Sequence, residues 1–348
     1  MSTSRGAEPS IVGPYLARVL GEPAWRDCTV DLITGGRSNL TYTVGCAADT
    51  VVLRRPPLSA VRPTAHDMGR EYRVLSALAG STVPVPGPLH LCTDPAVLGA
   101  PFYLMERVDG VVIRPGLPVD YARLPEQRAA MAEVLVGTLA DLHAIDPAAV
   151  GLTNFGRPDG YLARQVRRWV TQWEGWRDQD RPDLDRLAAR LAERVPANRS
   201  GPVVHGDYRL DNVMFDPADP TRIVAVLDWE MSTLGDPLAD LGLLLVYWTQ
   251  ARDEPLAGPA VVPAVTTLPG FPDRTDVVAD YVRRTGRDVT DLAWYMAFGF
   301  FKLAVVVAGI VVRERAGAMV GSQNDPPARS IDPLVRRGLE VLDSGHIG

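Results

Sequence analysis

The stretch that decides the fold is VVHGDYRLDNVMFD, residues 203–216, followed by RIVAVLDWE, residues 222–230. Each contains a short apolar run of strand length, and a turn rich in Asp and Pro separates the two. The first run leads into the spacing H-x-D-x-x-x-x-N, and the second run ends at Asp228. This spacing, with a later Asp after a strand, is the pattern of phosphoryl transfer.

Three side chains in this stretch have the chemistry that phosphoryl transfer requires. The transferred group shares negative charge with its neighbours, so divalent cations must bridge its oxygens. Mg²⁺ prefers hard oxygen ligands, which the amide of Asn212 and the carboxylate of Asp228 can supply. Asp207 lies on the same loop as Asn212 and can accept the proton of an attacking hydroxyl. We therefore expect Asp207 to be the catalytic base, Asn212 and Asp228 to bind the metal, and His205 to brace the loop by hydrogen bonding.

Composition excludes several other classes of protein. The chain has 348 residues, enough for two domains, and 46% of them are hydrophobic, so it can bury its own core. Its 42 acidic residues exceed its 36 basic ones, which argues against a nucleic-acid partner. The three cysteines have no ligand-like spacing and predict a reduced, cytoplasmic environment. The apolar run at 292–312 carries Lys302 near its middle, which favours a buried helix over a membrane partner.

The pattern of apolar residues changes from strand-like to helical along the chain, which predicts two structural parts. Residues 30–55 alternate as strands around a Gly-Gly turn, and residues 66–80 have helical spacing that ends at a glycine. Two more strands are expected at 89–92 and 101–108. Helical patterns dominate after residue 125. We place the join near Val108–Gly110, with a β-rich part at 1–108 and a larger, mainly helical part at 109–348.

The motifs, taken in order, resemble a known family. They are GGRSNLTY, VVLRRPP, GREYRVLSAL, FYLMERVDG, HGDYRLDN, LDWE and GDPLADL. Together they are similar to the aminoglycoside phosphotransferase and choline kinase-like family, in the branch associated with acyl-CoA dehydrogenases. The resemblance covers about residues 34–242. It implies an α+β, bilobal, protein-kinase-like fold, with a small antiparallel-sheet N-lobe for the nucleotide and a larger, mainly helical C-lobe for catalysis and the acceptor.

The resemblance also implies which residues bind ATP. Those expected at the phosphates are Gly35, Gly36, Arg37, Ser38 and Asn39, on a turn where small residues let backbone N–H groups approach. Arg54 stands where kinases usually have a lysine; strand alternation allows only one of Arg54 and Arg55 to face the nucleotide. Glu71 is the expected ion-pair partner of that cation. The hinge that binds adenine is expected at Glu106 to Val108, with Met105 at the back of the pocket.

The function implied is ATP- and Mg²⁺-dependent transfer of a phosphoryl group to a hydroxyl of a small molecule. Asp228-Trp229-Glu230 replaces the usual D-F-G, which disfavours a protein acceptor. A hydroxyacyl-CoA or hydroxy acid is the preferred acceptor. An aminoglycoside is the other, and would need an acidic patch, for which the candidates are Asp253, Glu254, Asp273, Asp276 and Asp280. The alternative function is that of a pseudokinase-like module, which binds a nucleotide without transferring its phosphate. The one feature that favours this alternative is Arg54, which stands where kinases usually have a lysine.

Overall fold

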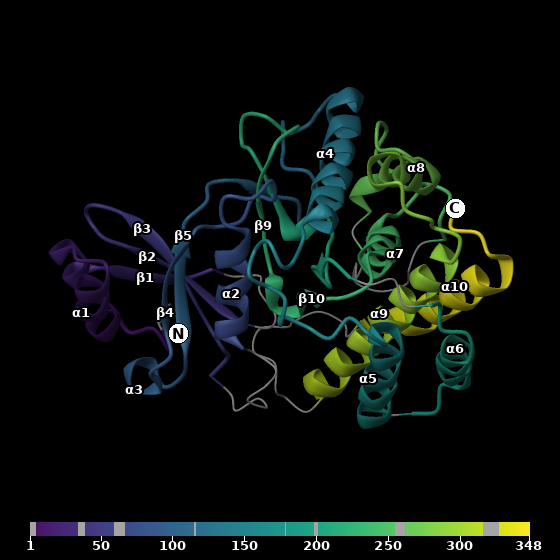
Figure 1. Cartoon of the computed structure of the whole chain (residues 1–348), viewed down its shortest axis with the longest axis horizontal. Helices are drawn as coiled ribbons and strands as arrows, with labels where there is room; N and C mark the ends of the chain where they lie inside the picture. Colours follow the sequence, from purple (N-terminus) through teal and green to yellow (C-terminus); the bar gives the residue numbers. More distant parts are fainter. Residues whose placement is uncertain are drawn as a thin grey trace. The chain divides into compact units, whose positions relative to one another are not determined.

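The computed structural model divides the chain into two compact units (Figure 1). The structure describes residues 5–33, 39–58, 67–114, 116–177, 179–197, 201–254, 262, 264–315 and 327–348. The first unit comprises Met1–Gly110 and Val224–Ser232, and the second comprises Val111–Ile223 and Thr233–Gly348. The first break in the chain falls within the expected join. Residues 224–232, which the sequence prediction placed with 109–348, group with the first unit and include Asp228.

A five-stranded antiparallel sheet organises the first unit, in the order β1-β2-β3-β5-β4. Its strands are β1 (Thr29–Leu32), β2 (Leu40–Gly45), β3 (Thr50–Arg55), β4 (Pro88–Cys92) and β5 (Phe102–Glu106). The β-branched residues of β2 and β3 face each other in register, as in the pair Val44 and Val51. Both are buried in a core that includes Trp25 and Phe102. The sheet is the antiparallel N-lobe sheet that the sequence predicts.

Three helices accompany this sheet: α1 (Pro9–Val19), α2 (Met68–Leu78) and α3 (Pro95–Leu98). Helix α2 begins where the Asp67 side chain accepts a hydrogen bond from the backbone of Arg70, which satisfies a free N–H of the first turn. Its buried face includes Met68, Glu71 and Leu75, at helical spacing. A carboxylate therefore lies among apolar side chains. Helix α1 has no counterpart in the sequence prediction.

Helices build the second unit. They are α4 (Pro125–Ala144), α5 (Tyr161–Trp176), α6 (Pro182–Glu193), α7 (Pro237–Tyr247), α8 (Arg274–Thr285), α9 (Leu292–Arg315) and α10 (Ile331–Ser344). Helix α9 is long and apolar enough to cross a membrane by length and composition, and 83% of its most apolar window is buried inside the protein. It packs against α5, α6, α7 and α10, as the sequence predicts for a core helix. A Cβ atom on Gly242 of α7 would lie 2.7 Å from the backbone of Tyr295, so glycine permits the close approach of α7 to α9.

Short strands hold the decisive loop at both ends. Strand β7 (Val203–Val204) pairs with β10 (Thr233–Leu234), and β6 (Val111–Val112) pairs with β8 (Val213–Phe215). The loop at 205–212 runs between β7 and β8 and ends in a 3-10 turn at Leu210–Asn212. Strand β9 (Ile223–Val226) then returns the chain to the first unit.

Candidate functional site

In the first unit, Arg54 lies at the centre of a cluster of charges, of which Glu71 is buried and the others are partly exposed. Its Nε lies 2.8 Å from Glu71 Oε2, and its Nη2 lies 2.5 Å from Asp228 Oδ1. Glu230 lies at 4.0 Å from the same guanidinium. The ion pair between Arg54 and Glu71 that the sequence predicts is therefore present.

The neighbouring arginine faces the other way. Arg55 donates to the backbone oxygens of Gly6 and Leu98, within the part of the unit that includes α1 and α3. Successive residues of a strand point to opposite faces, so Arg54 and Arg55 could not share one site. The sequence left open which of the two arginines faces the proposed site. In the structure Arg54 contacts the carboxylates of the cluster and Arg55 does not.

Polar side chains complete the cluster around Glu71. Tyr103 donates its hydroxyl to Glu71 Oε2 over 3.0 Å, and Asn39 donates to Glu71 Oε1 over 2.8 Å and to Glu230 over 3.1 Å. Burial raises the pKa of Glu71, and Arg54 counteracts this rise. Burial alone would lower the pKa of Arg54, but the surrounding carboxylates, Glu71 above all, raise it. Arg54 is therefore a permanent cation that several acidic groups share.

Asp228 adopts an unusual backbone conformation. Its φ of 65° and ψ of 59° lie in the left-handed region, which Asp tolerates better than most residues. The Trp229 indole donates to the Val226 carbonyl and ties the turn to β9. Arg54 occupies Oδ1 of Asp228, and among the residues with described positions Oδ2 has no partner, so it could accept another cation.

The expected adenine hinge lies at the end of β5. Met105 is half-buried and Glu106 is exposed. The Glu106 N–H donates to the Gly87 carbonyl over 2.8 Å, so that donor is already used. The roles of Met105, Glu106 and Val108 toward a nucleotide stay predictions.

The phosphate-binding turn falls mostly outside the described residues. The expected residues there are Gly35, Gly36, Arg37 and Ser38. Asn39, the last residue of the motif, is 5% exposed and makes the hydrogen bonds to Glu71 and Glu230 given above. It therefore links the end of the turn to the Arg54 cluster.

In the second unit, the loop at 205–212 orients Asp207. Asn212 donates its amide to the Asp207 backbone oxygen over 2.8 Å and to Asp207 Oδ2 over 2.9 Å, and Arg209 Nε lies 3.3 Å from Oδ2. In the described ranges, no donor reaches Asp207 Oδ1. The side chain is 23% exposed. One oxygen is thus held while the other can accept a proton.

Asp240, on helix α7, anchors the start of this loop. Its two oxygens accept the backbone N–H groups of His205 and Gly206 over 2.6 and 2.7 Å. The His143 ring donates from Nε2 to Asp240, and its Nδ1 accepts from the Tyr281 hydroxyl. Burial would raise the pKa of Asp240, but these donors lower it, so the carboxylate is ionised. Burial lowers the pKa of His143, so its ring is neutral.

His205 and Lys302 hold the next peptide of the loop. The Asp207 N–H donates to His205 Nδ1 over 3.2 Å, which confirms the expected bracing role of this histidine. Lys302 Nζ, from helix α9, donates to the Gly206 carbonyl over 2.5 Å. Lys302 is not among the residues that the sequence predicts for the site. The signal was present, because a charge inside a long apolar run calls for a polar partner.

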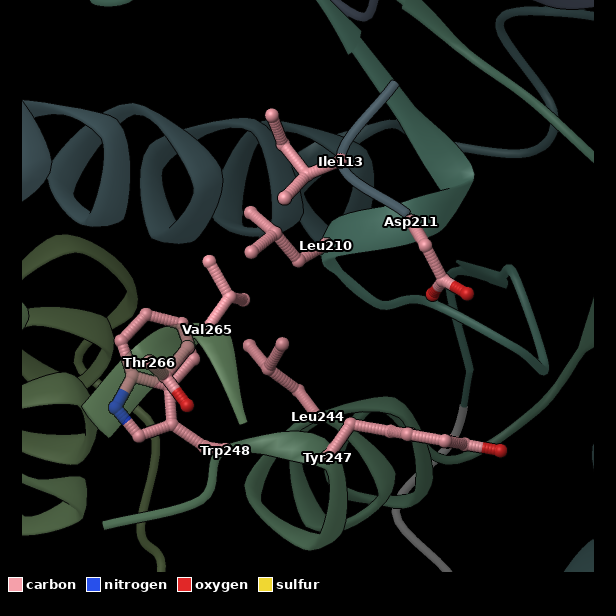
Figure 2. A pocket seen from close by; sticks show the side chains of 8 residues that line it. All are labelled: Ile113, Leu210, Asp211, Leu244, Tyr247, Trp248, Val265 and Thr266. Carbon is pink, nitrogen blue, oxygen red and sulfur yellow. The ribbon is translucent and has the colours of Figure 1, made fainter. Parts of the chain in front are cut away.

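A small cavity lies beside the loop (Figure 2). Most of its lining residues are apolar: Ile113, Leu210, Leu244, Tyr247, Trp248 and Val265, with Thr266 and Asp211. In Figure 2 the Asp211 carboxylate points away from the apolar side chains. The cavity volume is about 10 Å³, the space of about one water molecule. It is a packing defect under the loop and too small for a substrate.

The predicted magnesium ligands have suitable donor atoms. Both hydrogen bonds of the Asn212 amide use its nitrogen, which leaves the oxygen for a cation. Asp228 offers a carboxylate oxygen. In the part of the chain that the structure describes, no three His, Cys, Asp or Glu side chains gather as a metal site. Each of the two residues therefore offers a hard oxygen of the kind that Mg²⁺ prefers.

The two units and the loop define the class of the protein. A small antiparallel sheet with a buried Arg–Glu pair, and a larger helical unit with an H-x-D-x-x-x-x-N loop, constitute an α+β, bilobal, protein-kinase-like fold. The model of the phosphotransferase enzyme family matches residues 29–262. The chain belongs to this family.

Similar proteins place the chain within the family. Acyl-CoA dehydrogenase family member 11 of Rattus norvegicus is 35% identical over 320 residues, which cover 90% of this chain and 40% of the relative. Family member 10 of Mus musculus is 34% identical, over 87% of this chain and 28% of the relative. The chain therefore spans less than half the length of these relatives. The resemblance to the dehydrogenase-associated branch is confirmed.

Solved structures confirm the fold. A candidate aminoglycoside phosphotransferase from Ralstonia eutropha JMP134 matches with a TM-score of 0.81 and 33% identity, over 97% of this chain and 98% of that one. A thermostable mutant of aminoglycoside phosphotransferase APH(4)-Ia, in ternary complex with ADP and hygromycin B, matches with a TM-score of 0.60 and 16% identity, over 96% of this chain and 98% of that chain. At that identity the second likeness concerns the fold alone.

Proposed function

We propose that this protein transfers the γ-phosphoryl group of ATP, with Mg²⁺, to the hydroxyl of a small acceptor that carries an anionic group. The observation that supports it most is the Asp207 carboxylate, which has one oxygen held by Asn212 and one that no donor among the described residues reaches. A carboxylate held in this way can accept the hydroxyl proton as the oxygen attacks phosphorus. The relatives in the phosphotransferase enzyme family support the same reaction type.

The nucleotide is assigned to residues of the first unit. Arg54, held by Glu71, provides a fixed cation for the phosphates, and a guanidinium can grip two phosphate oxygens at once. Asn212 and Asp228 are the proposed magnesium ligands. When bound, the ion neutralises charge that develops on the phosphate oxygens. For Asp228 to bind it fully, the ion pair with Arg54 must loosen, because that pair occupies one carboxylate oxygen.

Charge favours an anionic acceptor over an aminoglycoside. The acidic residues considered for a polycation are mostly paired with arginines: Asp253 with Arg274 and Arg337, Glu254 with Arg336, Asp273 with Arg252, and Asp280 with Arg284. Their negative charge is therefore compensated. Lys302 interacts electrostatically with Arg168 and Arg209 as well as with Asp207, and Arg209 is paired with Asp207 and Asp211. Positive charge near the proposed base suits an acceptor with a carboxylate or phosphates.

The names of the relatives point to the same acceptor class. They are acyl-CoA dehydrogenase family members, and coenzyme A thioesters carry several phosphate charges. We therefore propose a hydroxyacyl-CoA or a free hydroxy acid as the acceptor. The second candidate function is nucleotide binding without transfer. The bond between Arg54 and Asp228 favours it, because it engages a proposed metal ligand.

The test is an ADP-release assay with Mg-ATP and a panel of hydroxyacyl-CoAs, hydroxy acids and aminoglycosides. We expect turnover with an acyl or acid acceptor, and a phosphorylated hydroxyl in the product by ³¹P NMR. Asp207→Asn should lower kcat about 1,000-fold, within the range for loss of a general base, and leave ATP affinity within twofold. Asp219→Asn, on an exposed turn of the same unit, is the matched control. ATP binding without transfer to any acceptor would support the second function.

A further inference from the structure

Lys302 is the one lysine among the 36 basic residues of the chain. It lies on helix α9, where it is the one charged residue between Leu292 and Val312. A chain that uses arginine everywhere else places its single ammonium group in its most apolar helix. Burying a charge in such a place costs stability unless the charge is well partnered. The position therefore calls for a functional explanation.

The ammonium group contacts the loop that carries Asp207. Nζ donates to the Gly206 carbonyl and lies 5.6 Å from the centre of the Trp169 ring, within cation–π distance. In the described residues, no carboxylate lies within 4.0 Å of Nζ. Lys302 is therefore not one half of an ordinary ion pair. Its hydrogen bond goes to a backbone oxygen of the loop.

That carbonyl belongs to the peptide plane between Gly206 and Asp207. Lys302 holds the C=O side of this plane, and His205 Nδ1 holds the N–H side by accepting from Asp207. Asp240 holds the preceding N–H, that of Gly206. Gly206 has a φ of 82°, a conformation that glycine adopts without strain. A flexible residue is thus fixed on both sides, directly before the proposed base.

We propose that Lys302 is a positioning residue, whose ammonium group fixes the Gly206–Asp207 peptide plane and so orients the Asp207 carboxylate for proton transfer. The role in proton transfer rests on the proposed function, whereas the contact with the loop does not. Lysine suits this place better than arginine because its ammonium is compact and its donors rotate to meet a single carbonyl.

The charges around Lys302 give a readout that does not depend on activity. Burial lowers the pKa of Lys302, while Asp207 and Asp240 counteract this by favouring the charged amine, and Arg168 and Arg209 lower the pKa further. Neutralising Asp207 removes one of the two favourable carboxylates. The pKa of Lys302 must then fall.

Because the chain has one lysine, protein grown with ¹³C-lysine gives one lysine Cε signal, and its pH titration reports Lys302 alone. We expect a pKa below the 10.5 of a free lysine, and a further decrease of at least half a unit in Asp207→Asn. Asp211→Asn, on the same loop, should change it by less than a third of that amount. If Lys302 titrates like a free lysine, and its pKa is the same in wild type and in Asp207→Asn, the contact is absent and the proposal is wrong.

Kinetics of Lys302→Met then test the positioning role. A displaced base can cost about 100-fold, so we expect kcat to fall by about 100-fold while KM for ATP stays within twofold. Lys302→Arg should recover at least tenfold of that loss. The melting temperature of Lys302→Met should not fall, since an apolar side chain of similar length replaces a half-buried charge on an apolar helix. Val306→Met, half-buried one turn along α9, is the matched control and should stay within twofold of wild type.

Three results would contradict this role: kcat of Lys302→Met within threefold of wild type, a loss of kcat that follows a loss of folded protein, or a rise in KM for the acceptor at unchanged kcat. The last would make Lys302 an acceptor-binding residue. If the wild type transfers phosphate to no acceptor, the proposed function fails. The lysine titration would still decide whether Lys302 faces Asp207.

Discussion

The Arg54 cluster of the first unit and the Asp207 loop of the second unit hold their charged groups in opposite ways. In the cluster, one cation is shared by Glu71, Asp228 and Glu230, so side chains satisfy side chains. On the loop, Asp240 and Lys302 bind mainly backbone groups. A cluster of side chains can rearrange when a nucleotide and a metal bring new charges. A backbone held at both N–H and C=O keeps its shape.

This difference suits the two proposed tasks. A phosphate grip must exchange partners, because Arg54 has to turn part of its hydrogen bonding from Asp228 to the nucleotide. A base must stay where the hydroxyl arrives, because small displacements cost rate. Substitution of Asp240 should therefore damage folding and kcat together, and substitution of Lys302 should damage kcat alone. Substitutions in the cluster should mainly damage nucleotide binding.

The largest effect is expected for Asp240→Ala. It leaves the N–H groups of His205 and Gly206 buried without their acceptor and removes the partner of His143. Breaking such a buried charged network costs about 3–5 kcal/mol of the free energy of unfolding. Urea unfolding measures this loss, and kcat should fall in the protein that stays folded. Asp219→Ala, in an exposed turn, should cost less than about 1 kcal/mol. Equal losses in both variants would refute the anchoring role.

The two neighbouring arginines of β3 give the next test. Arg54→Met removes the proposed phosphate cation and should weaken ATP binding at least tenfold, since charge-assisted hydrogen bonds contribute about 1.5–3 kcal/mol. Arg55→Met removes bonds to the backbone of Gly6 and Leu98 on the opposite face. It should lower the melting temperature and leave ATP affinity within twofold. Calorimetric titration with Mg-ATP measures both. If the two variants lowered ATP affinity equally, the assignment of Arg54 as the phosphate-binding cation would be wrong.

The sequence predicted most of the fold because strong local patterns carried it. Alternation and β-branched residues located β1, β2 and β3, and helical spacing located α2 and α4. Periodicity describes neighbours along the chain. It contains no information on which unit a short strand and its turn will join, so the grouping of 224–232 with the first unit could not be predicted from it. Helix α1 was missed because its one internal proline, Pro14, and the adjacent Gly13 weaken the helical signal.

For the site, the sequence predicted the residues of the motifs but could not predict which residues distant in sequence would lie beside them. The spacing of Asp207 and Asn212 and the pairing of Arg54 with Glu71 could be read from motifs, since each depends on one loop or one strand and helix. Lys302 could not, because it lies far from the loop in sequence and reaches it only through the packing of α9. The side-chain direction of Arg54 depended on which face of β3 is buried, and the sequence of that strand leaves this open.

A smaller effect is expected where α7 crosses α9, the contact that carries Asp240 and Lys302 to the same loop. Gly242→Ala would place a methyl group 2.7 Å from the backbone of Tyr295, so the helices must separate slightly. Overpacking of this kind costs about 1–3 kcal/mol. The free energy of unfolding should fall by that amount, with kcat reduced more than ATP affinity. Gly175→Ala, on α5 with no atom near the added methyl, is the control.

The smallest effect concerns pH and His143. Burial lowers the pKa of this ring in the folded protein below the 6.5 of a free histidine. As pH falls through 6.5, the unfolded chain takes up the proton first, so the free energy of unfolding falls. Between pH 7 and 5.5 this contributes up to about 1 kcal/mol. Asp240 also has a lowered pKa, but its unfolded value of 3.8 places its contribution at more acidic pH.

The variant His143→Gln separates the contribution of His143 to the free energy of unfolding from the contributions of other groups that titrate in the same pH range. The variant should be less stable than wild type at pH 7, because the bonds to Asp240 and Tyr281 change, but the difference between the two proteins should shrink as the pH falls to 5.5. His346→Gln, at the exposed C-terminus, should run parallel to wild type throughout. A difference that instead grows as the pH falls to 5.5 would mean that the ring is charged in the folded protein. The support of the loop would then be an ion pair, like the supports of Arg54, and the contrast between the two units would be weaker than their geometry indicates.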